Sequence, residues 1–533
     1  MRHLLVVGLA AAVSDGEMER VIVDTFAGRG ALLGSATAAY QVEGGRYTTS
    51  GPENTGKITG TLRENHIWDD FSRNVTLHGS NTADVAVDFY HHWEQDVDLI
   101  HSLNFNAFRF SISWSRFVHI DPSTKAQTIN PAGVAFYQGL VDALHARGIE
   151  PVVTLYHWDL PSALVDYQNL TAHGGLNDPE FVGYFVAYAE LVFGNLRGVR
   201  YYTTFNEPQS ICCGGYGGTG AAPGLGSTLQ MYRCGHHLLV AHAHAVASFR
   251  RTAPAGAKIS LNLNQDFPYP RNASDPDDRA AAERQLIFRL GWWADPVFGT
   301  GDYPKEMKEF FVEHGIDLRF TPEEQRLLKG SADYYAMQHY SSMVCTPAGK
   351  STRENFGVQC TSEGTEARGW WPAASFWLKV HPEGIRAMLG WIQARYHPNE
   401  LIITENGVDD EDNGSAAGPT PSCGALDDPS RPGQCGACTL ANVRDQFRVE
   451  YYRGYLYNVA LAVKDGVNVR GYFAWSLLDN FEWSDGFRCR FGLVCIDYTA
   501  PGKTRIPKSS AGWWRQLLAR IDSARTTVVD ALI

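Results

Sequence analysis

The 533-residue sequence predicts an α/β protein that folds as a single (β/α)8 TIM barrel with loop insertions. Eight short apolar segments alternate with helical stretches, and several of these segments are solidly hydrophobic, as strands buried on both faces are. Eight strand–helix units favour a closed parallel barrel over an open doubly wound sheet. No Gly-x-Gly-x-x-Gly pattern follows the first strand, which disfavours a dinucleotide-binding open sheet.

The expected strands are short, rich in apolar or β-branched residues and bounded by polar or turn-forming residues. They lie at residues 32–38, 107–112, 151–156, 200–205, 258–263, 333–337, 401–404 and 471–475. After the first strand, Val85, Phe89, Trp93 and Val97 recur every fourth residue, which predicts an amphipathic helix. Further helical stretches lie near residues 132–147, 179–196, 229–251, 278–291, 380–396, 442–464 and 508–521. Residues 409–440, rich in Gly, Pro, Ser, Asp and Cys, form an insertion in one barrel loop.

Composition limits the partners. The formal net charge of −12 argues against nucleic acid or an anionic membrane as a partner, because both require basic patches. A hydrophobic content of 44% is ample for one large core, and 14 tryptophans leave aromatic surface for a ligand. The net charge says little about a neutral substrate.

The N-terminal residues 1–14 have the composition of a secretory signal peptide, which leaves residues 15–533 for the barrel. Met1-Arg2-His3 supplies a positive start, Leu4 to Val13 is apolar or small, and Ala10 to Ala12 offer small residues for cleavage. A buried N-terminal strand is the alternative. The apolar run is too short to span a bilayer.

Cysteines and glycosylation sequons also favour secretion. The chain has ten cysteines, and its Asn-x-Ser/Thr sequons begin at Asn74, Asn169, Asn272 and Asn413. Cys435 and Cys438 have the spacing of half a zinc site, but no second pair of ligands matches them. Disulfides are therefore expected, with their connectivity open, and no metal or other cofactor is expected.

Polar and aromatic side chains gather where the strands end, and the active site of such a barrel lies at the C-terminal ends of its strands. Pro208 closes the fourth strand and should hold Glu207 extended at its tip. The residues at the strand ends, in chain order, are Gln41, Arg109, His157, Asn206 with Glu207, Gln338 with His339 and Tyr340, Glu405, Trp475, and Glu482 with Trp483.

This inventory fits carbohydrate chemistry. Glu207 alone could be a solvated charge at a strand end, His157 a core histidine and Arg109 a structural ion pair. Together with the other strand-end residues, Glu207 and Glu405 place two carboxyl groups, from different strands, at one mouth. Cleavage of a glycosidic bond needs two such groups, while indole faces stack on sugar rings and amides pair with hydroxyls. No phosphate cradle or Ser/Cys nucleophile motif competes.

Five motifs in a fixed order resemble the family 1 glycoside hydrolases, the β-glucosidase group. They are Phe108-Arg-Phe-Ser-Ile-Ser-Trp-Ser-Arg116, Tyr156-His-Trp-Asp-Leu-Pro161, Thr204-Phe-Asn-Glu-Pro208, Ile402-Ile-Thr-Glu-Asn-Gly407 and Gly471-Tyr-Phe-Ala-Trp-Ser-Leu-Leu-Asp-Asn-Phe-Glu-Trp483. The resemblance covers roughly residues 26–520.

The resemblance implies a retaining double displacement, in which Glu207 is the acid/base and Glu405 the nucleophile. Arg109 and Tyr340 are expected to hold and neutralise Glu405. The sugar-binding residues implied in the same way are Gln41, His157, Asn206, Tyr340, Glu482 and Trp483, with Trp475 as the stacking floor and Trp377 on the aglycone side.

The chain departs from the family pattern at several positions. Gln338 and His339 stand where the family commonly has asparagine and tyrosine, so the resemblance gives them no role. In the glycine-rich loop from Cys212 to Arg233, the cysteine spacing of the plant members is not reproduced, so no matching disulfide is implied. Cys489 stands where the family often has serine.

The predicted function is hydrolysis of terminal β-D-glucosyl residues from O-β-glucosides or cello-oligosaccharides in a secretory compartment. A thioglucosidase is the second enzyme hypothesis, but the plant thioglucosidases carry glutamine where this chain has Glu207. The non-enzymatic hypothesis is a catalytically silent sugar- or partner-binding homologue, and such proteins typically lose one of the two glutamates. The natural aglycone and the oligomeric state stay open.

Overall fold

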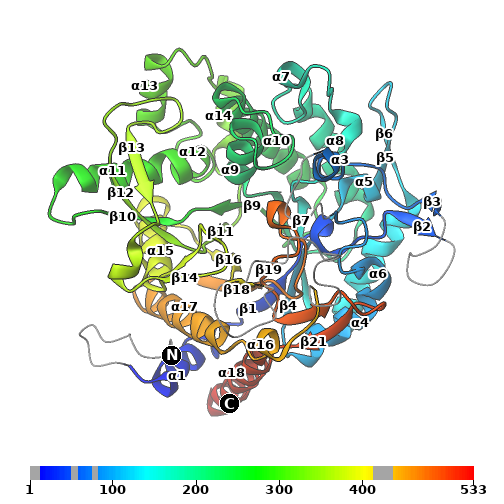
Figure 1. Cartoon of the computed structure of the whole chain (residues 1–533), viewed down its shortest axis with the longest axis vertical. Coiled ribbons are helices and arrows are strands. Elements are labelled where there is room, and N and C mark those ends of the chain that lie inside the picture. Colours follow the sequence, from blue (N-terminus) through cyan, green and yellow to red (C-terminus); the bar gives the residue numbers. More distant parts are fainter. Residues whose placement is uncertain (1–12, 50–57, 75–81, 412–435, 533) are drawn as a thin grey trace, which may run out of the picture.

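The computed structural model describes residues 13–49, 58–74, 82–411 and 436–532, and its centre is a closed barrel of eight parallel strands (Figure 1). In chain order, these strands are β1 (Leu32–Ala36), β4 (Ala107–Ser111), β7 (Glu150–Tyr156), β8 (Tyr201–Asn206), β9 (Lys258–Asn264), β11 (Tyr335–Gln338), β16 (Leu401–Asn406) and β18 (Val469–Trp475). β1 pairs with both β18 and β4, which closes the barrel. The predicted fold class is confirmed.

Each barrel strand lies within two residues of its predicted range. The main helices around the barrel are α4 (Phe89–Ser102), α6 (Pro131–Ala146), α8 (Phe181–Asn195), α10 (Thr228–Thr252), α11 (Pro276–Leu286), α15 (Glu383–Tyr396), α17 (Gln446–Lys464) and α18 (Ser509–Leu532). Val85, which was predicted to lie in this first helix, lies outside α4. Asp88, with φ +56°, precedes Phe89 in the left-handed region, so the helix begins one turn later than the apolar stripe suggests.

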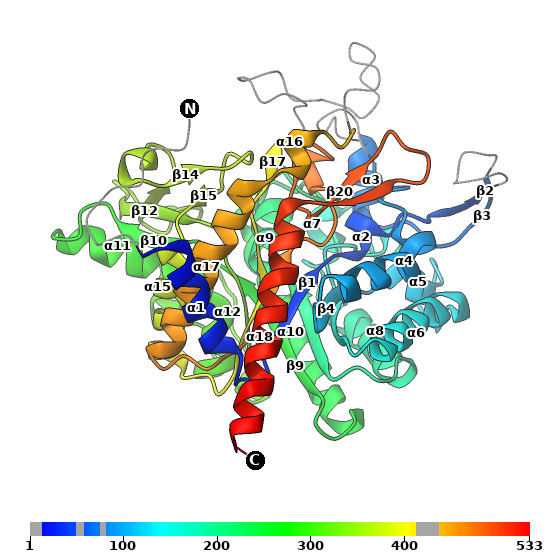
Figure 2. The same cartoon turned by 90° about the horizontal axis from the view of Figure 1, so that it is seen from below.

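One long helix was not predicted from the sequence. α1 (Asp15–Phe26) begins at Ser14, whose side chain accepts from the Glu17 backbone N–H, as an N-cap serine does. It packs against α17 and α18, so the first and last helices of the described chain lie side by side on the outside of the barrel (Figure 2). Residues 1–12 lie outside the described part, and with them most of the predicted signal peptide.

Three of the barrel ladders change register close to their C-terminal ends. The shifts fall between Thr203 and Asn206 on β8, between Met337 and Gln338 on β11, and between Ile403 and Asn406 on β16. An irregularity of this kind bends a strand and re-aims its side chains. All three shifts therefore lie where strands deliver predicted site residues.

Disulfides cross-link segments that lie outside the barrel strands. The described pairs are Cys212–Cys234, Cys345–Cys360 and Cys438–Cys495, whereas Cys213 and Cys489 are free. The first pair closes the glycine-rich loop that begins at Cys212, because α10 brings Cys234 back to Cys212 with a Cα–Cα distance of 5.7 Å.

Cys438 is bound to Cys495, which excludes it from a zinc site, and the described residues contain no cluster of His, Cys, Asp and Glu that could hold a metal. Cys423, Cys435, the Asn413 sequon and most of the 409–440 insertion lie outside the described residues. No helix in the described ranges is long and apolar enough to cross a membrane.

Candidate active site

A cavity of about 560 Å³ opens at the C-terminal ends of the barrel strands. Both predicted glutamates line it, as do the following residues predicted to bind substrate: His157, Asn206, Tyr340, Trp377, Trp475, Glu482 and Trp483. Gln41 and Arg109 are fully buried just behind this lining. Sequence reasoning missed several lining residues, including Trp68, Trp158, Asp266, Gln285 and Arg289.

The backbone turns sharply at Glu207. The residue has φ +42° and ψ +62°, so it lies in the left-handed region and is not extended as expected from the proline that follows it. Its N–H donates to the Asn262 carbonyl oxygen at 3.0 Å, and Pro208 begins the short helix α9 (Pro208–Ile211). The turn places the Glu207 side chain on the cavity wall, where it is partly exposed.

Glu405 is held from both sides of its carboxylate. Arg109 Nη1 donates to Oε1, and the Tyr340 hydroxyl donates to Oε2 at 2.6 Å. Burial raises the pKa of Glu405 above its ordinary value, while the Arg109 charge and the Tyr340 hydroxyl act in the opposite direction. These contacts favour the ionised form of Glu405 and fix the direction of its carboxylate.

Glu207 lacks such an ion pair among the described residues. Desolvation raises the pKa of Glu207, and the neighbouring negative charge of Glu405 raises it further, with smaller opposing effects from Ser210 and Arg109. Two carboxyl groups that share one low-dielectric site do not ionise independently. Glu405, which has the cation and the hydroxyl donor, is the one of the pair that ionises first.

Asn206 joins the strands around the two glutamates. Its Oδ1 accepts from Arg109 Nη2 at 2.6 Å and from Gln338 Nε2 at 2.7 Å, and its Nδ2 donates to His157 Nε2 at 3.1 Å. Gln338, which was assigned no role in the sequence analysis, therefore fixes the orientation of the Asn206 amide. His339 does not line the cavity, and its Nδ1 contacts the Gln265 carbonyl oxygen at 3.0 Å.

The sugar-binding residues predicted at the β1, β7 and β18 ends leave buried polar atoms without a partner in the described structure. These atoms are Gln41 Oε1, His157 Nδ1 and Glu482 Oε1. Because His157 Nε2 accepts from Asn206, its Nδ1 carries the proton, and burial with the nearby Arg109 lowers the pKa of this imidazole well below its ordinary value. Buried polar groups require hydrogen-bond partners, so these atoms can form hydrogen bonds with the hydroxyl groups of a ligand.

Gln41 also orients Glu482. Its Nε2 donates to Asn480 Oδ1 at 2.9 Å and to Glu482 Oε2 at 3.2 Å. Gln41 therefore contacts Glu482 directly. Because Gln41 is not one of the residues that line the cavity, its role as a sugar ligand stays a prediction.

Aromatic rings surround this end of the cavity. His157 stacks on Trp475 and Trp483 with centroid distances of 6.0 and 5.9 Å, and Trp158 packs on Trp483 at 4.5 Å. Gly407 stands directly beside Trp475, because a Cβ at this position would lie 1.9 Å from the Trp475 carbonyl oxygen. Trp377 approaches the Tyr340 ring edge-on at 5.8 Å.

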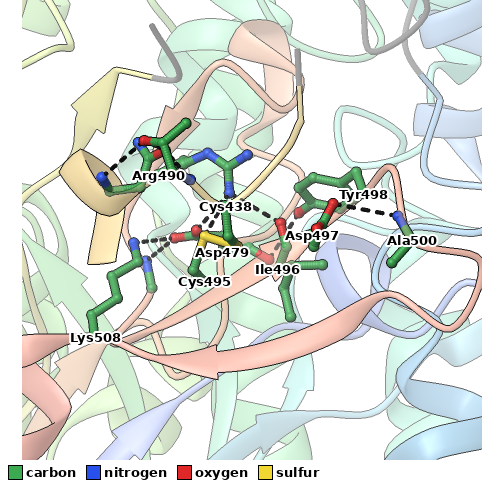
Figure 3. The surroundings of a disulfide bond; sticks show 12 residues. Cys438, Asp479, Arg490, Cys495, Ile496, Asp497, Tyr498, Ala500 and Lys508 are labelled. Atoms are coloured by element: carbon green, nitrogen blue, oxygen red, sulfur yellow. Dashed lines mark hydrogen bonds and ion pairs between the residues drawn. A yellow bond between two sulfur atoms is a disulfide. The ribbon is translucent and has the colours of Figure 1, made fainter. Parts of the chain in front are cut away.

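A buried ionic network holds the loop that carries Glu482 (Figure 3). Arg490 Nη1 donates to Asp479 Oδ2 at 2.9 Å, and Lys508 Nζ donates to Asp479 Oδ1 at 2.7 Å. The Tyr498 hydroxyl donates to the Asp479 carbonyl oxygen at 2.9 Å, beside the Cys438–Cys495 disulfide. Satisfied from several directions, Asp479 fixes the backbone three residues before Glu482.

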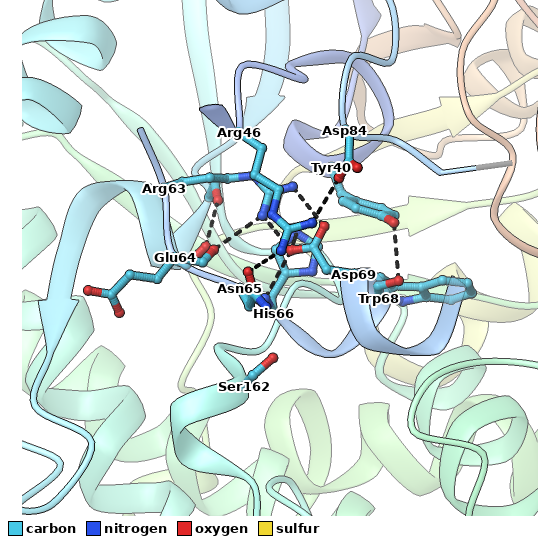
Figure 4. A network of polar contacts seen from close by, with 12 residues as sticks. Tyr40, Arg46, Arg63, Glu64, Asn65, His66, Trp68, Asp69, Asp84 and Ser162 are labelled. Carbon is cyan, nitrogen blue, oxygen red and sulfur yellow. Dashed lines mark hydrogen bonds and ion pairs between the residues drawn. The ribbon is translucent and has the colours of Figure 1, made fainter. Parts of the chain in front are cut away.

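A second network of polar contacts supports the segment that carries Trp68, one of the aromatic residues lining the cavity (Figure 4). Arg63 donates to both oxygens of Asp69, at 2.6 and 2.9 Å. Burial opposes ionisation of Asp69, but Arg63 and its neighbours hold the pKa of Asp69 below its ordinary value. This ion pair anchors the helix that presents Trp68, whose ring lies 4.7 Å from that of Trp483.

The barrel and its pair of carboxyl groups, surrounded by amides and indoles, define a glycoside hydrolase. The comparisons assign the family: the sequence model of glycosyl hydrolase family 1 matches residues 24–522, and the chain belongs to this family. It is 40% identical to beta-glucosidase 42 of Arabidopsis thaliana over 502 residues, which cover 91% of this chain and 92% of that protein.

Other relatives agree with this assignment. Beta-glucosidase 1B of Phanerodontia chrysosporium is 37% identical, over 91% of this chain and 84% of that protein. Among solved structures, beta-glucosidase 2 of Trichoderma reesei, in complex with Tris, superposes with a TM-score of 0.80 at 36% identity, over 93% of this chain and 99% of that chain.

Proposed function

We propose that this protein is a retaining β-glucosidase that hydrolyses O-β-glucosides, with Glu207 as acid/base and Glu405 as nucleophile. The observation that carries the proposal is the unequal environment of the two carboxyl groups. Glu405 has a cation and a hydroxyl donor, whereas Glu207 faces the charge of Glu405 without an ion pair among the described residues. The relatives named beta-glucosidase support the same activity.

In the first step, a Glu405 oxygen attacks the anomeric carbon and the bond from that carbon to the aglycone oxygen breaks. Glu207 transfers its proton to the departing oxygen, so the aglycone leaves as a neutral alcohol and a glucosyl ester forms on Glu405. Arg109 and Tyr340 keep the attacking carboxylate ionised and aligned before the reaction, which lowers the reorganisation cost.

In the second step, the ionised Glu207 takes a proton from water, and the resulting hydroxide oxygen attacks the anomeric carbon. The ester bond to Glu405 breaks, β-glucose is released and Glu207 is again protonated. The negative charge on Glu405 disappears while the ester exists. Because that charge raises the pKa of Glu207, its loss lowers the Glu207 pKa when a base is required.

We propose that the glucosyl ring occupies the end of the cavity formed by the unpartnered atoms of Gln41, His157 and Glu482. Trp475 is the proposed stacking floor, and Asn206, fixed by Arg109 and Gln338, is positioned to contact the sugar beside Glu405. Trp377 is assigned to the aglycone side.

We further propose that the protein is secreted and glycosylated. Three disulfides in the described part are typical of an oxidising compartment. The sequon residues Asn74, Asn169 and Asn272 are exposed. Expression in a eukaryotic host, followed by enzymatic removal of N-glycans, should lower the mass of the protein; an unchanged mass would contradict the glycosylation.

The activity is tested by following hydrolysis of an aryl β-D-glucoside by proton NMR. The proposed double displacement predicts that β-glucose appears first and mutarotates afterwards. Initial release of α-glucose would indicate an inverting mechanism. Absence of turnover on any β-glycoside tested would support the sugar-binding homologue, and preferential turnover of a thioglucoside would support the thioglucosidase.

A further inference from the structure

Arg289 is the only lysine or arginine side chain that lines the described cavity. The other charged groups that line the cavity are carboxyl groups: Glu207, Asp266, Glu405, Glu482 and Asp485. No described carboxylate forms a salt bridge with Arg289, although the chain as a whole is acidic. An arginine without a counter-charge on a cavity wall can bind an anionic group, because its planar fork matches a carboxylate.

Two π-helical turns hold Arg289 in place. It lies in η5 (Ile287–Gly291), which continues α11, and its Nη1 donates to the Cys213 sulfur at 2.9 Å. Cys213 belongs to η4 (Cys212–Gly217), which directly follows α9. The guanidinium also lies 5.1 Å from the Phe356 ring centroid. A thiol is a weak acceptor, so these contacts orient the guanidinium without neutralising it.

The position of Arg289 assigns it to the aglycone side. Its contact, Cys213, lies just beyond Glu207 in the same loop, and Glu207 is the proposed proton donor to the aglycone oxygen. The proposed glucose ligands Gln41 and Glu482 come instead from the loops after β1 and β18. A leaving group that departs toward Glu207 therefore moves into the part of the cavity lined by Arg289.

Neighbouring groups on this wall are compatible with an anion. Gln285, one turn before Arg289, lines the cavity with an amide. One Asp266 oxygen accepts from the Ser341 N–H at 3.1 Å, and burial raises the pKa of Asp266 to about 7. Asp266 therefore binds protons more readily than an ordinary aspartate and opposes an incoming anion less.

Resting on the proposed function, we propose that Arg289 binds a carboxylate on the aglycone, so that β-glucosides of carboxylate-bearing aglycones form a preferred substrate class. A neutral sugar aglycone would use the amides of this wall but would leave the Arg289 charge without a partner. The specificity is therefore expected to reside in the charge of the aglycone.

The test compares 4-carboxyphenyl and 3-carboxyphenyl β-D-glucosides with the corresponding carbamoylphenyl β-D-glucosides, which have similar shape and no charge. For the wild type, kcat/KM should be higher for at least one carboxylate than for its amide partner. In Arg289→Gln this ratio should fall roughly tenfold, as expected for the loss of one charge-assisted hydrogen bond. Arg289→Lys should retain part of the preference.

Arg233→Gln is the matched control, because it removes one positive charge from an exposed position on α10 that does not line the cavity. It should keep the wild-type ratio. An equal ratio in the wild type and Arg289→Gln, or an equal loss for cellobiose and the carboxylate, would overturn the inference. Turnover of the amide substrates by the wild type tests the proposed function separately, so the two failures are distinguishable.

Discussion

The ends of β8 and β16 present the same functional group, a glutamate carboxyl, to the same cavity, but they surround it differently. At β16, Arg109 and Tyr340 contact Glu405 directly. At β8, a left-handed backbone turn places Glu207 on the wall, where desolvation and the charge of Glu405 raise its pKa. In the proposed mechanism, the neighbours, not the residue type, divide the acid and nucleophile roles between the two groups.

Replacement of the β16 carboxylate should have the largest effect. Glu405→Gln removes the proposed nucleophile, and kcat on aryl β-glucosides should fall by at least about 10⁴-fold, as for other covalent catalysts. In a Glu405→Gly variant, adding sodium azide should restore turnover with formation of α-glucosyl azide, because a small anion can occupy the space that the missing side chain leaves. Appearance of β-glucosyl azide instead would contradict the assignment.

Replacement of the β8 carboxyl should depend on the leaving group. Glu207→Gln removes a general acid, so kcat/KM should fall by about 10²- to 10⁴-fold for alkyl glucosides and cellobiose. For 2,4-dinitrophenyl β-glucoside, whose leaving group needs little protonation, the first step should be far less affected. Equal losses for both substrates would contradict the acid/base role.

The same variant tests the pH dependence. The first step needs Glu405 ionised and Glu207 protonated, so activity should fall as the pH decreases through the Glu405 pKa and as it increases through the Glu207 pKa. Both pKa values are raised, so the acidic and alkaline limbs of the pH–activity profile should both lie above the ordinary glutamate pKa of about 4.3. In Glu207→Gln the alkaline limb of kcat/KM should disappear; an unchanged limb would show that another group controls it.

Removal of the cation beside Glu405 should reduce the difference in pKa between the two carboxyl groups. Arg109→Met removes charge-assisted hydrogen bonds to Glu405 and Asn206, and kcat/KM should fall by about 10- to 100-fold or more. The acidic limb should move to higher pH, because Glu405 loses the positive charge that lowers its pKa. If circular dichroism shows an intact fold and the limb does not move, the proposed stabilisation of Glu405 is wrong.

The smallest expected effect is that of the tyrosine. Tyr340→Phe removes one hydroxyl donor to Glu405 and should reduce kcat/KM by about tenfold, with a smaller upward shift of the acidic limb than in Arg109→Met. Tyr455→Phe is a matched control, because its hydroxyl contacts the Tyr340 carbonyl oxygen and not Glu405. A shift of equal size in both variants would argue for a purely structural effect.

Much of this arrangement could be predicted from the sequence. Apolar segments and helical periodicity gave all eight barrel strands, since burial on both faces is a strong constraint on residue type. The rule that barrel sites lie at the C-terminal strand ends placed Glu207 and Glu405 together, and both line the cavity.

The missed features depend on distant parts of the chain or on local backbone geometry. Gln338 acts through Asn206, 132 positions away, and Arg289 contacts Cys213, 76 positions away. The left-handed backbone of Glu207 opposes the local preference of a residue before proline, so tertiary contacts must impose it. Single-sequence periodicity contains no signal for such contacts.

The central claim is that Glu405 forms the covalent bond to the sugar and Glu207 does not. It is tested most directly by inactivating the wild type with 2,4-dinitrophenyl 2-deoxy-2-fluoro-β-D-glucoside, which slows breakdown of the intermediate, and mapping the adduct by peptide mass spectrometry. The expected result is one fluoroglucosyl group on the peptide that contains Glu405. A fluoroglucosyl group on Glu207 or on any other residue would contradict the account.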